Sequence, residues 1–249
     1  RQEELLSELK KPELEKDDKS RLAVLDELGN LYFLAGEMDK AVLTMRETSA
    51  LQEKLKDEAG LSSTLENLGG ILKDVNDLKG AEECFSRAME LKEKNNDTQG
   101  LTELYGNRVN VLMMLGQLPE AEKIIKKSTR TNKKNGNEVG LMNDYRNMGN
   151  LSMQKNDWAN ADKFYKSSLE INTKSNDKYE ISEDYRNRGN LYLQKEDWNL
   201  CEKLMLESLK ISEEINDLRN ICHDSRVLGS IYSEKKSRNK QEEYYKKAL

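Results

Sequence analysis

The chain has 249 residues, of which 36% are hydrophobic and 35% charged, and 41 basic residues nearly balance 46 acidic ones to leave a net charge of −5. This hydrophobic content argues against a thick central core, and 2 Pro with 14 Gly are too few turn residues for a sandwich or barrel with many hairpins. No apolar run approaches the roughly 18 residues that a membrane-spanning helix needs, so we expect long helices and no membrane segment.

A forty-residue repeat organises the sequence. A column of glycines recurs at this spacing, with Val109 as its one exception, and columns of small and then large residues follow it at fixed offsets. The glycines are Gly29, Gly69, Gly149, Gly189 and Gly229; the small residues are Ala41, Ala81, Ala121, Ala161 and Cys201; the large residues are Met45, Phe85, Ile125, Tyr165, Met205 and Tyr245. The pattern predicts pairs of helices that approach closely, with the large side chains filling the gap between them.

Residues that end and start helices have the same period. Gly36, Asn76, Gly116 and Asn156 tolerate the left-handed conformation that ends a helix, whereas Glu196 and Lys236, in the same column, lack this preference. A second column consists of good N-cap residues, namely Asp17, Asp57, Asp97, Asn137, Asp177 and Asp217. Each repeat is therefore predicted to be a helix of about 15 residues, a tight turn and a helix of about 18 residues.

In chain order, residues 1–17 are expected to hold the second helix of a preceding imperfect repeat, for which Leu5, Leu6 and Leu9 supply an apolar stripe. Pro12 either disturbs this helix or begins the next one. One continuous array then follows, with repeats at 18–57, 58–97, 98–137, 138–177 and 178–217 and a degraded, truncated sixth repeat at 218–249. Arg238 and Gln241 replace apolar and small residues in that sixth repeat, which is typical of a capping repeat.

The pattern Leu28-Gly29, Tyr32, Gly36 and Ala41 resembles the tetratricopeptide repeat, and so does Leu68-Gly69, Ala81, Phe85 and Ala88. The usual repeat has 34 residues, and the forty-residue version is similar to the repeats of Pins-type adaptors, kinesin light chain and bacterial Rap-type regulators. The resemblance implies an all-α fold, an α-solenoid of about six antiparallel helix pairs wound into a right-handed superhelix, with the first helix of each pair lining the concave side. Such repeats pack only on their neighbours, which accounts for the low hydrophobic content.

The cysteines and the single histidine do not indicate an enzyme. Cys84, Cys201 and Cys222 are odd in number and lack metal-ligand spacing, so we expect a reducing, intracellular and cytoplasmic location. Cys222 and His223 are adjacent, and adjacent residues of one helix point about 100° apart, which prevents a bond between their side chains. We expect no catalysis, metal or cofactor in this segment and leave open a catalytic domain elsewhere in a longer protein.

Two columns of asparagine lie within the first helices of the repeats. These asparagines are the candidate peptide-binding residues. They comprise Asn30, Asn110, Asn150 and Asn190 at one position, and Asn67, Asn107, Asn147 and Asn187 three positions earlier. A spacing of three places both columns on one helix face, where each amide offers a donor and an acceptor to an extended peptide backbone. The columns resemble the asparagine ladder of the O-linked N-acetylglucosamine transferase and of kinesin light chain. The alternative is that these side chains bridge neighbouring repeats.

The residues one position before Asn67, Asn107, Asn147 and Asn187 form a further column, in which the charge changes sign along the chain. The residues are Asp26, Glu66, Gly106, Arg146, Arg186 and Arg226. The three arginines favour a surface that receives an acidic segment, since a guanidinium pairs well with a carboxylate. The alternative is internal pairing across repeats with Asp144, Asp184 and Asp224.

These observations predict a non-catalytic protein-interaction scaffold that binds a protein or peptide of acidic character in its groove. The alternative is a regulatory or sensor segment of a larger enzyme or signalling protein, docking on a catalytic domain. Nucleic-acid binding is not expected at an isoelectric point near 5.3, because affinity for phosphates needs a net basic surface.

Overall fold

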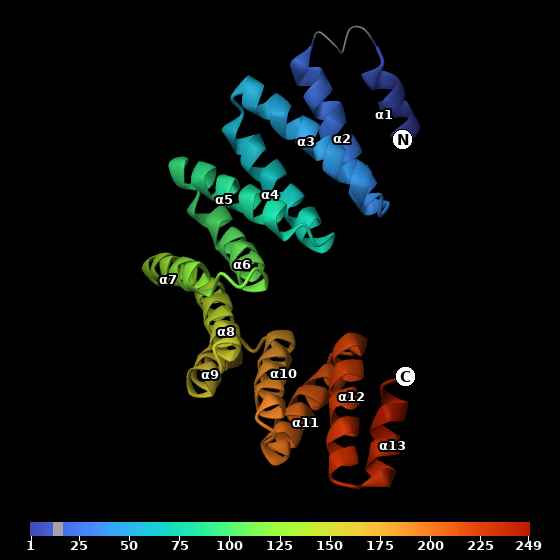
Figure 1. The fold of residues 1–249 in the computed structure, drawn as a ribbon, viewed down its shortest axis with the longest axis vertical. Helices are drawn as coiled ribbons and strands as arrows, with labels where there is room; N and C mark the ends of the chain where they lie inside the picture. The colour runs from blue at the N-terminus through green and yellow to red at the C-terminus, as the bar shows by residue number, and fades with distance from the viewer. Residues whose placement is uncertain (12–16) are drawn as a thin grey trace. The chain divides into compact units, whose positions relative to one another are not determined.

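The computed structural model describes residues 1–11 and 17–249, so Pro12 and its predicted effect on the first helix lie outside the described residues. The described residues form α-helices joined by short turns, and they divide into two compact units, an N-terminal unit of residues 1–125 and a C-terminal unit of residues 126–249. Consecutive helices within each unit form antiparallel pairs (Figure 1). The all-α solenoid class predicted from the repeat is confirmed.

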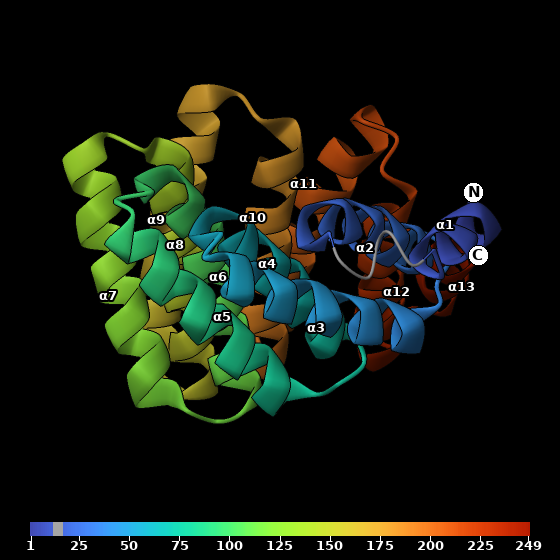
Figure 2. The same ribbon diagram turned by 90° about the horizontal axis from the view of Figure 1, so that it is seen from above.

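The N-terminal unit is built from helices α1 to α6 and the first part of α7. Figure 2 shows α2, α3 and α4 side by side in this unit. The bounds are α1 (Gln2–Leu9), α2 (Asp18–Leu34), α3 (Met38–Leu55), α4 (Glu58–Asp74), α5 (Leu78–Lys94), α6 (Thr98–Met114) and α7 (Leu118–Asn135).

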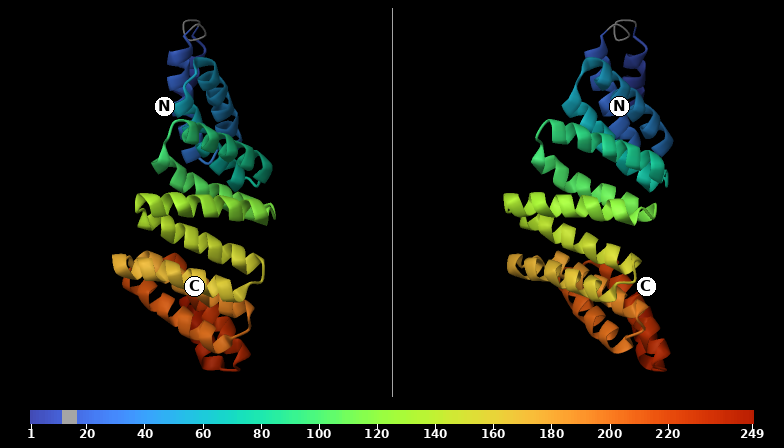
Figure 3. Two further views of the ribbon diagram at one scale, coloured as in Figure 1. Left: turned by 90° about the vertical axis from the view of Figure 1, so that its left-hand side faces the viewer. Right: turned by 60° about the vertical axis from the view of Figure 1, so that its left-hand side comes forward.

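The C-terminal unit begins within α7 and continues through the remaining helices, whose succession can be followed in Figure 3. The bounds are α8 (Glu138–Gln154), α9 (Trp158–Ser175), α10 (Lys178–Gln194), α11 (Trp198–Glu214), α12 (Leu218–Glu234) and α13 (Arg238–Lys247). The even-numbered helices α2 to α12 are the first helices of the repeats. Among the described residues, no helix is both long and apolar enough to cross a membrane.

The predicted starts and ends of the helices are confirmed. Asp57 accepts a hydrogen bond from the Gly60 amide at 2.9 Å, and each of the other predicted caps accepts at least one amide in the same way. The first helices are longer than predicted, at 17 residues each. Glu196 and Lys236 adopt the left-handed conformation, with φ of 58° and 54°, although their side chains do not favour it.

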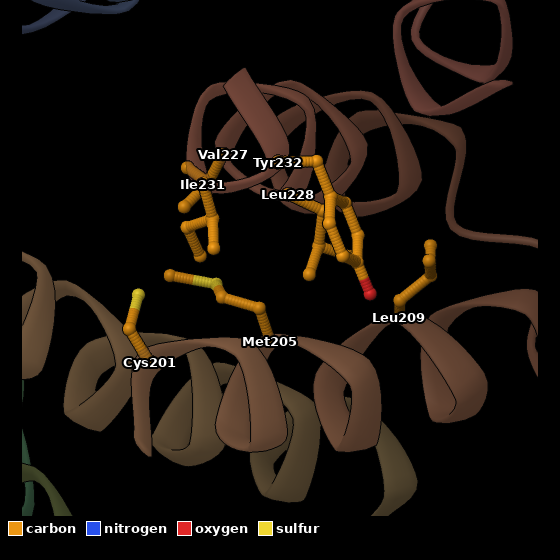
Figure 4. Packing of buried hydrophobic residues seen from close by; sticks show 7 residues of the cluster. All are labelled: Cys201, Met205, Leu209, Val227, Leu228, Ile231 and Tyr232. Atoms are coloured by element: carbon orange, nitrogen blue, oxygen red, sulfur yellow. The ribbon is translucent and has the colours of Figure 1, made fainter. Parts of the chain in front are cut away.

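The glycine column of the first helices faces the large column of the second helices. A Cβ atom added at Gly149 would lie 2.4 Å from Cε1 of Tyr165, and one at Gly189 would lie 2.7 Å from Cε of Met205. Met205 also belongs to a buried cluster between α11 and α12, which Figure 4 shows at close range. The absence of a side chain at these glycines therefore lets the two helices of a repeat approach, as the sequence predicts.

The two ends of the chain fit the predicted pattern less closely. In α1, Leu5 is buried, but Leu6 is 39% exposed and Leu9 half-buried, so the expected apolar stripe is only partly covered. In α13 no residue is fully buried, although Tyr245 contacts the position of Gly229. Trp158 and Trp198, at the start of α9 and α11, are partly buried against the neighbouring clusters and serve as packing residues.

A buried carboxylate links neighbouring repeats in the C-terminal unit. Asp184 of α10 has no exposed surface, and its two oxygens accept hydrogen bonds from Ser168 Oγ at 2.8 Å and Asn172 Nδ2 at 2.6 Å, both on α9. Arg146 Nη2 of α8 lies 3.1 Å from the same carboxylate, so three successive helices share one charge. In the preceding repeat, Asn132 Nδ2 of α7 donates to Asp144 of α8 at 2.9 Å.

The close approach at Gly149 predicts a destabilising effect of a single methyl group. Gly149→Ala should lower the free energy of unfolding, because overpacking costs about 1–3 kcal/mol, more than the helix propensity gained. Gly70→Ala is the matched control: a Cβ there meets no atom within 4 Å, so this variant should gain up to about 1 kcal/mol. Urea unfolding followed by circular dichroism measures both, and equal effects of the two variants would contradict this packing.

The hydrogen bonds of Asp184 predict a large cost of removing its carboxylate. Asp184→Ala removes one of the two carboxylates that pair with Arg146 and leaves two polar side chains of α9 without their buried acceptor, which should destabilise the C-terminal unit by about 3 kcal/mol at neutral pH. Glu170→Ala, at an exposed position of α9, should change the unfolding free energy little. Chemical denaturation compares the two variants, and a loss at Asp184 no larger than that at Glu170 would count against the shared-charge description.

Burial also makes stability depend on pH, because desolvation raises the pKa of Asp184. A carboxyl whose native pKa exceeds the unfolded value of about 3.9 binds its proton more tightly in the folded state, so its contribution to stability falls as pH rises through the native pKa. The melting temperature of the parent chain should therefore fall relative to that of Asp184→Asn as pH rises above about 4. Parallel melting curves over this range would contradict the raised pKa.

Candidate functional site

The asparagine columns lie on the first helices of both units and are accessible. Asn30 is on α2, Asn67 on α4, and Asn107 and Asn110 on α6; these four belong to the N-terminal unit. The C-terminal unit carries Asn147 and Asn150 on α8 and Asn187 and Asn190 on α10. Three of the eight (Asn30, Asn67 and Asn110) are exposed and the other five are half-buried.

One of the eight side chains has a hydrogen-bond partner among the described residues. The Tyr165 hydroxyl of α9 donates to Asn150 Oδ1 at 2.7 Å, which joins the two helices of one repeat. Within the described part of the chain, the other seven amides make no side-chain hydrogen bond, and none joins one repeat to the next. The structure thus leaves most of this amide surface available to a ligand.

In the N-terminal unit, part of the asparagine set lines a cavity of about 430 Å³. Asn30, Asn67 and Asn107 come from α2, α4 and α6 and meet there, whereas Asn110 does not line it. Gly70 occupies the position that carries Asn30 and Asn110 in the adjacent repeats. The cavity therefore places amide groups of three successive first helices around one hollow.

The arginine column has internal partners in two of its three members. Arg146 Nη2 lies 2.7 Å from Glu180 Oε2 and 3.1 Å from Asp184 Oδ1, both on the first helix of the next repeat. Arg186 pairs with Glu183 of its own helix and with Asn220 of α12. Pairing across repeats, one of the two alternatives raised by the sequence, is what the structure has at Arg146.

Arg226 differs from the two preceding arginines. It is exposed on α12, and its guanidinium makes no ion pair with any residue that the structure describes. Asp224, two residues earlier, is fully buried, and its Oδ1 lies 3.2 Å from Nδ1 of His223. Of the three arginines, Arg226 alone thus keeps an uncompensated charge at the surface of the described chain.

Sequence reasoning missed the buried polar column that receives the carboxylates. Eleven residues after the small column of the second helices, the chain has Gln52, Lys92, Asn132, Asn172 and Ser212, all buried. Asn132 and Asn172 bind Asp144 and Asp184, and Lys92 Nζ lies 3.1 Å from Glu66 Oε2. The period of forty contains this signal, but the polarity of these residues makes them resemble a solvent-exposed face.

The cysteine and histidine side chains do not converge on one site. Cys222 Sγ lies 3.2 Å from the carbonyl of Ala248, and the partner of His223 is Asp224. Burial raises the pKa of Cys201 to about 12 and that of Cys84 to about 11, so both thiols are held in their protonated form. Among the described residues, no group of three or more His, Cys, Asp and Glu side chains is arranged to hold a metal ion.

Comparison with known proteins identifies the repeat. Residues 62–95 and 227–249 match the tetratricopeptide repeat model. No curated protein sequence matches the chain.

Several solved structures share the fold at low sequence identity. Apo RapI is 12% identical with a TM-score of 0.70, over 91% of this chain and 96% of that one. Repeats assigned to a kinesin light chain of Podosopora anserina are 15% identical with a TM-score of 0.66, over 80% and 97% of the two chains. A signal transduction ATPase with a tetratricopeptide repeat sensor, from Pyrococcus horikoshii, is 16% identical with a TM-score of 0.72, over 91% of this chain and 35% of that one.

Tetratricopeptide-repeat folds are generally non-catalytic scaffolds for protein–protein interaction. The repeat-model matches at residues 62–95 and 227–249, the forty-residue register and the paired helices together show tetratricopeptide repeats in a fold of the α-solenoid class.

Proposed function

We propose that the chain is an interaction scaffold that binds an extended peptide on the face formed by its first helices, through the side-chain amides of the asparagine columns. The observation that carries this proposal is that seven of the eight asparagines have no side-chain partner within the described chain, while three of the eight are exposed and the other five are partly exposed. An unpaired Asn inside a helix costs helix propensity, and a peptide backbone supplies the donor and acceptor that its amide lacks.

We assign the acidic character of the partner to the region around Arg226. Arg146 and Arg186 each have a carboxylate neighbour, so their charges are largely balanced within the repeat array. Arg226 is exposed and retains the capacity to bind a carboxylate with two parallel hydrogen bonds. A peptide segment bound to the C-terminal unit with Asp or Glu near Arg226 fits this arrangement.

The alternative function is a regulatory or sensor segment that docks on a catalytic domain. Two of the similar structures are described as RapI and as an ATPase with a tetratricopeptide repeat sensor, and this chain spans about a third of the latter. On this alternative, the same asparagine face would bind a segment of the catalytic protein instead of a free peptide.

The proposal predicts that the unpaired asparagines matter for binding and not for folding. A peptide selected by phage display on the whole chain should bind Asn147→Ala/Asn187→Ala less tightly, by about 1 kcal/mol for each lost hydrogen bond, as measured by fluorescence anisotropy. The melting temperature should not fall, because neither amide has an internal partner in the described structure and alanine favours the helix.

Two controls separate binding from structure. Asn143→Ala changes an exposed asparagine of α8 outside both columns and should leave the affinity unchanged. Asn150→Ala removes the acceptor of the Tyr165 hydroxyl and should lower stability. Equal affinity of the double variant and the parent chain would overturn the proposed role of the columns.

A further inference from the structure

We propose that the hollow at Gly70 in the N-terminal unit is a specificity pocket for a cationic side chain of the bound peptide, arginine above all. This inference rests on the proposed function, because it assigns one side chain of the peptide that the asparagine face binds. It concerns the N-terminal unit alone and is independent of the acidic contact assigned to Arg226 in the C-terminal unit.

The hollow exists because the asparagine column is interrupted. Gly70 stands where Asn30 and Asn110 stand in the adjacent repeats, and a Cβ atom added at Gly70 meets no atom within 4 Å. The missing side chain leaves a cavity of about 430 Å³ that α2, α3, α4 and α6 line. This volume accommodates one long side chain of a peptide lying across the first helices.

The floor of the hollow is apolar. Met45 and Ile71 are buried beneath it, and Phe33 of α2 is 41% exposed at its side. A methylene stem packs favourably on such a floor, and a guanidinium plane stacks on an aromatic face such as that of Phe33. The floor therefore matches a side chain with an apolar stem and a planar charged end.

The rim of the hollow is acidic. Its charged residues are three carboxylates, Glu66, Asp74 and Glu103, and one lysine, Lys73. Lys92 Nζ lies 3.1 Å from Glu66, and Lys73 Nζ lies 3.6 Å from Asp74, so these two carboxylates have internal partners. Glu103 of α6 has no ion pair among the residues that the structure describes.

An entering cation would compensate the charge of Glu103 and donate to the side-chain oxygens of Asn67 and Asn107. Arginine suits this site better than lysine, because its guanidinium has five donors in a fixed plane. An acidic side chain would meet three carboxylates. An aliphatic side chain would cover the floor but leave Glu103 partly desolvated without a partner, which is unfavourable.

The test uses display of randomised peptides on the whole chain, followed by affinity measurement. Peptides selected on the parent chain should carry Arg or Lys at one position. Replacing that Arg by citrulline, which keeps the shape and removes the charge, should weaken binding about tenfold. With Glu103→Gln the loss on citrulline substitution should disappear, whereas Glu83→Gln, at an exposed position of α5, should retain it.

A second variant fills the hollow directly. Gly70→Asn restores the column and has room for its side chain, so its melting temperature should be at least that of the parent chain. Peptide selection on this variant should still succeed but should no longer enrich a basic position.

The possible outcomes separate the two proposals. If selected peptides bind through the asparagine face but show no basic position and no citrulline effect, the cationic pocket is wrong and the scaffold function stands. If the parent chain selects no peptide at all, both proposals are overturned. If Gly70→Asn keeps both its stability and the preference for arginine, the pocket lies elsewhere and the assignment to Gly70 is wrong.

Discussion

The buried carboxylate of Asp184 is the interaction on which the stacking of repeats in the C-terminal unit depends. It receives hydrogen bonds from two side chains of α9 and the guanidinium of Arg146 from α8, so it satisfies polar groups of two helices at once. A stacked array has no central core to hold a repeat in place. The donors lie at fixed positions on neighbouring helices. They can therefore pair with the buried carboxylate in only one alignment of these helices, because a shift of one residue would leave the carboxylate unpaired.

The polar residues of the first helices therefore fall into two groups, those that pair between repeats and those that stay without an internal partner. Arg146 and Arg186 lie one residue before Asn147 and Asn187, and in a helix that difference of about 100° turns their side chains toward the next repeat. These two arginines therefore stabilise the contact between neighbouring repeats, while the asparagines beside them stay without internal partners. Binding is accordingly assigned to neutral amides, with charge contributing only where a charged side chain is left uncompensated, as at Arg226 and Glu103.

The two units use the same position of the second helix with different chemistry. In the N-terminal unit, Lys92 of α5 binds Glu66 of α4, so the cation lies on the second helix and the carboxylate on the first. In the C-terminal unit, Asn172 of α9 binds Asp184 of α10. The forty-residue register thus repeats the polar position on the second helix but not its partner, because Glu66 lies on the first helix of the same repeat as Lys92 and Asp184 on the first helix of the repeat after Asn172. The first helices carry acidic residues at Glu66 and Glu103 and a basic one at Arg226.

The helices, their caps and the repeat spacing of this protein follow from its amino-acid sequence, because each of them depends on local chemistry repeated every forty residues. Aspartate at the N-caps, glycine facing Tyr165 and Met205, and the asparagine columns could all be read from spacing. The partners of these side chains depend on contacts between helices, which spacing does not give. Arg146 and Asp184 are 38 residues apart, and spacing alone could not separate internal pairing from ligand binding. The left-handed turns at Glu196 and Lys236 are imposed by the packing of the helix pairs against the preference of the residues themselves. The hollow at Gly70 arises because α2, α3 and α6 surround a position of α4 that has no side chain. The sequence shows that the side chain is missing, but it does not show that the neighbouring helices leave the space empty.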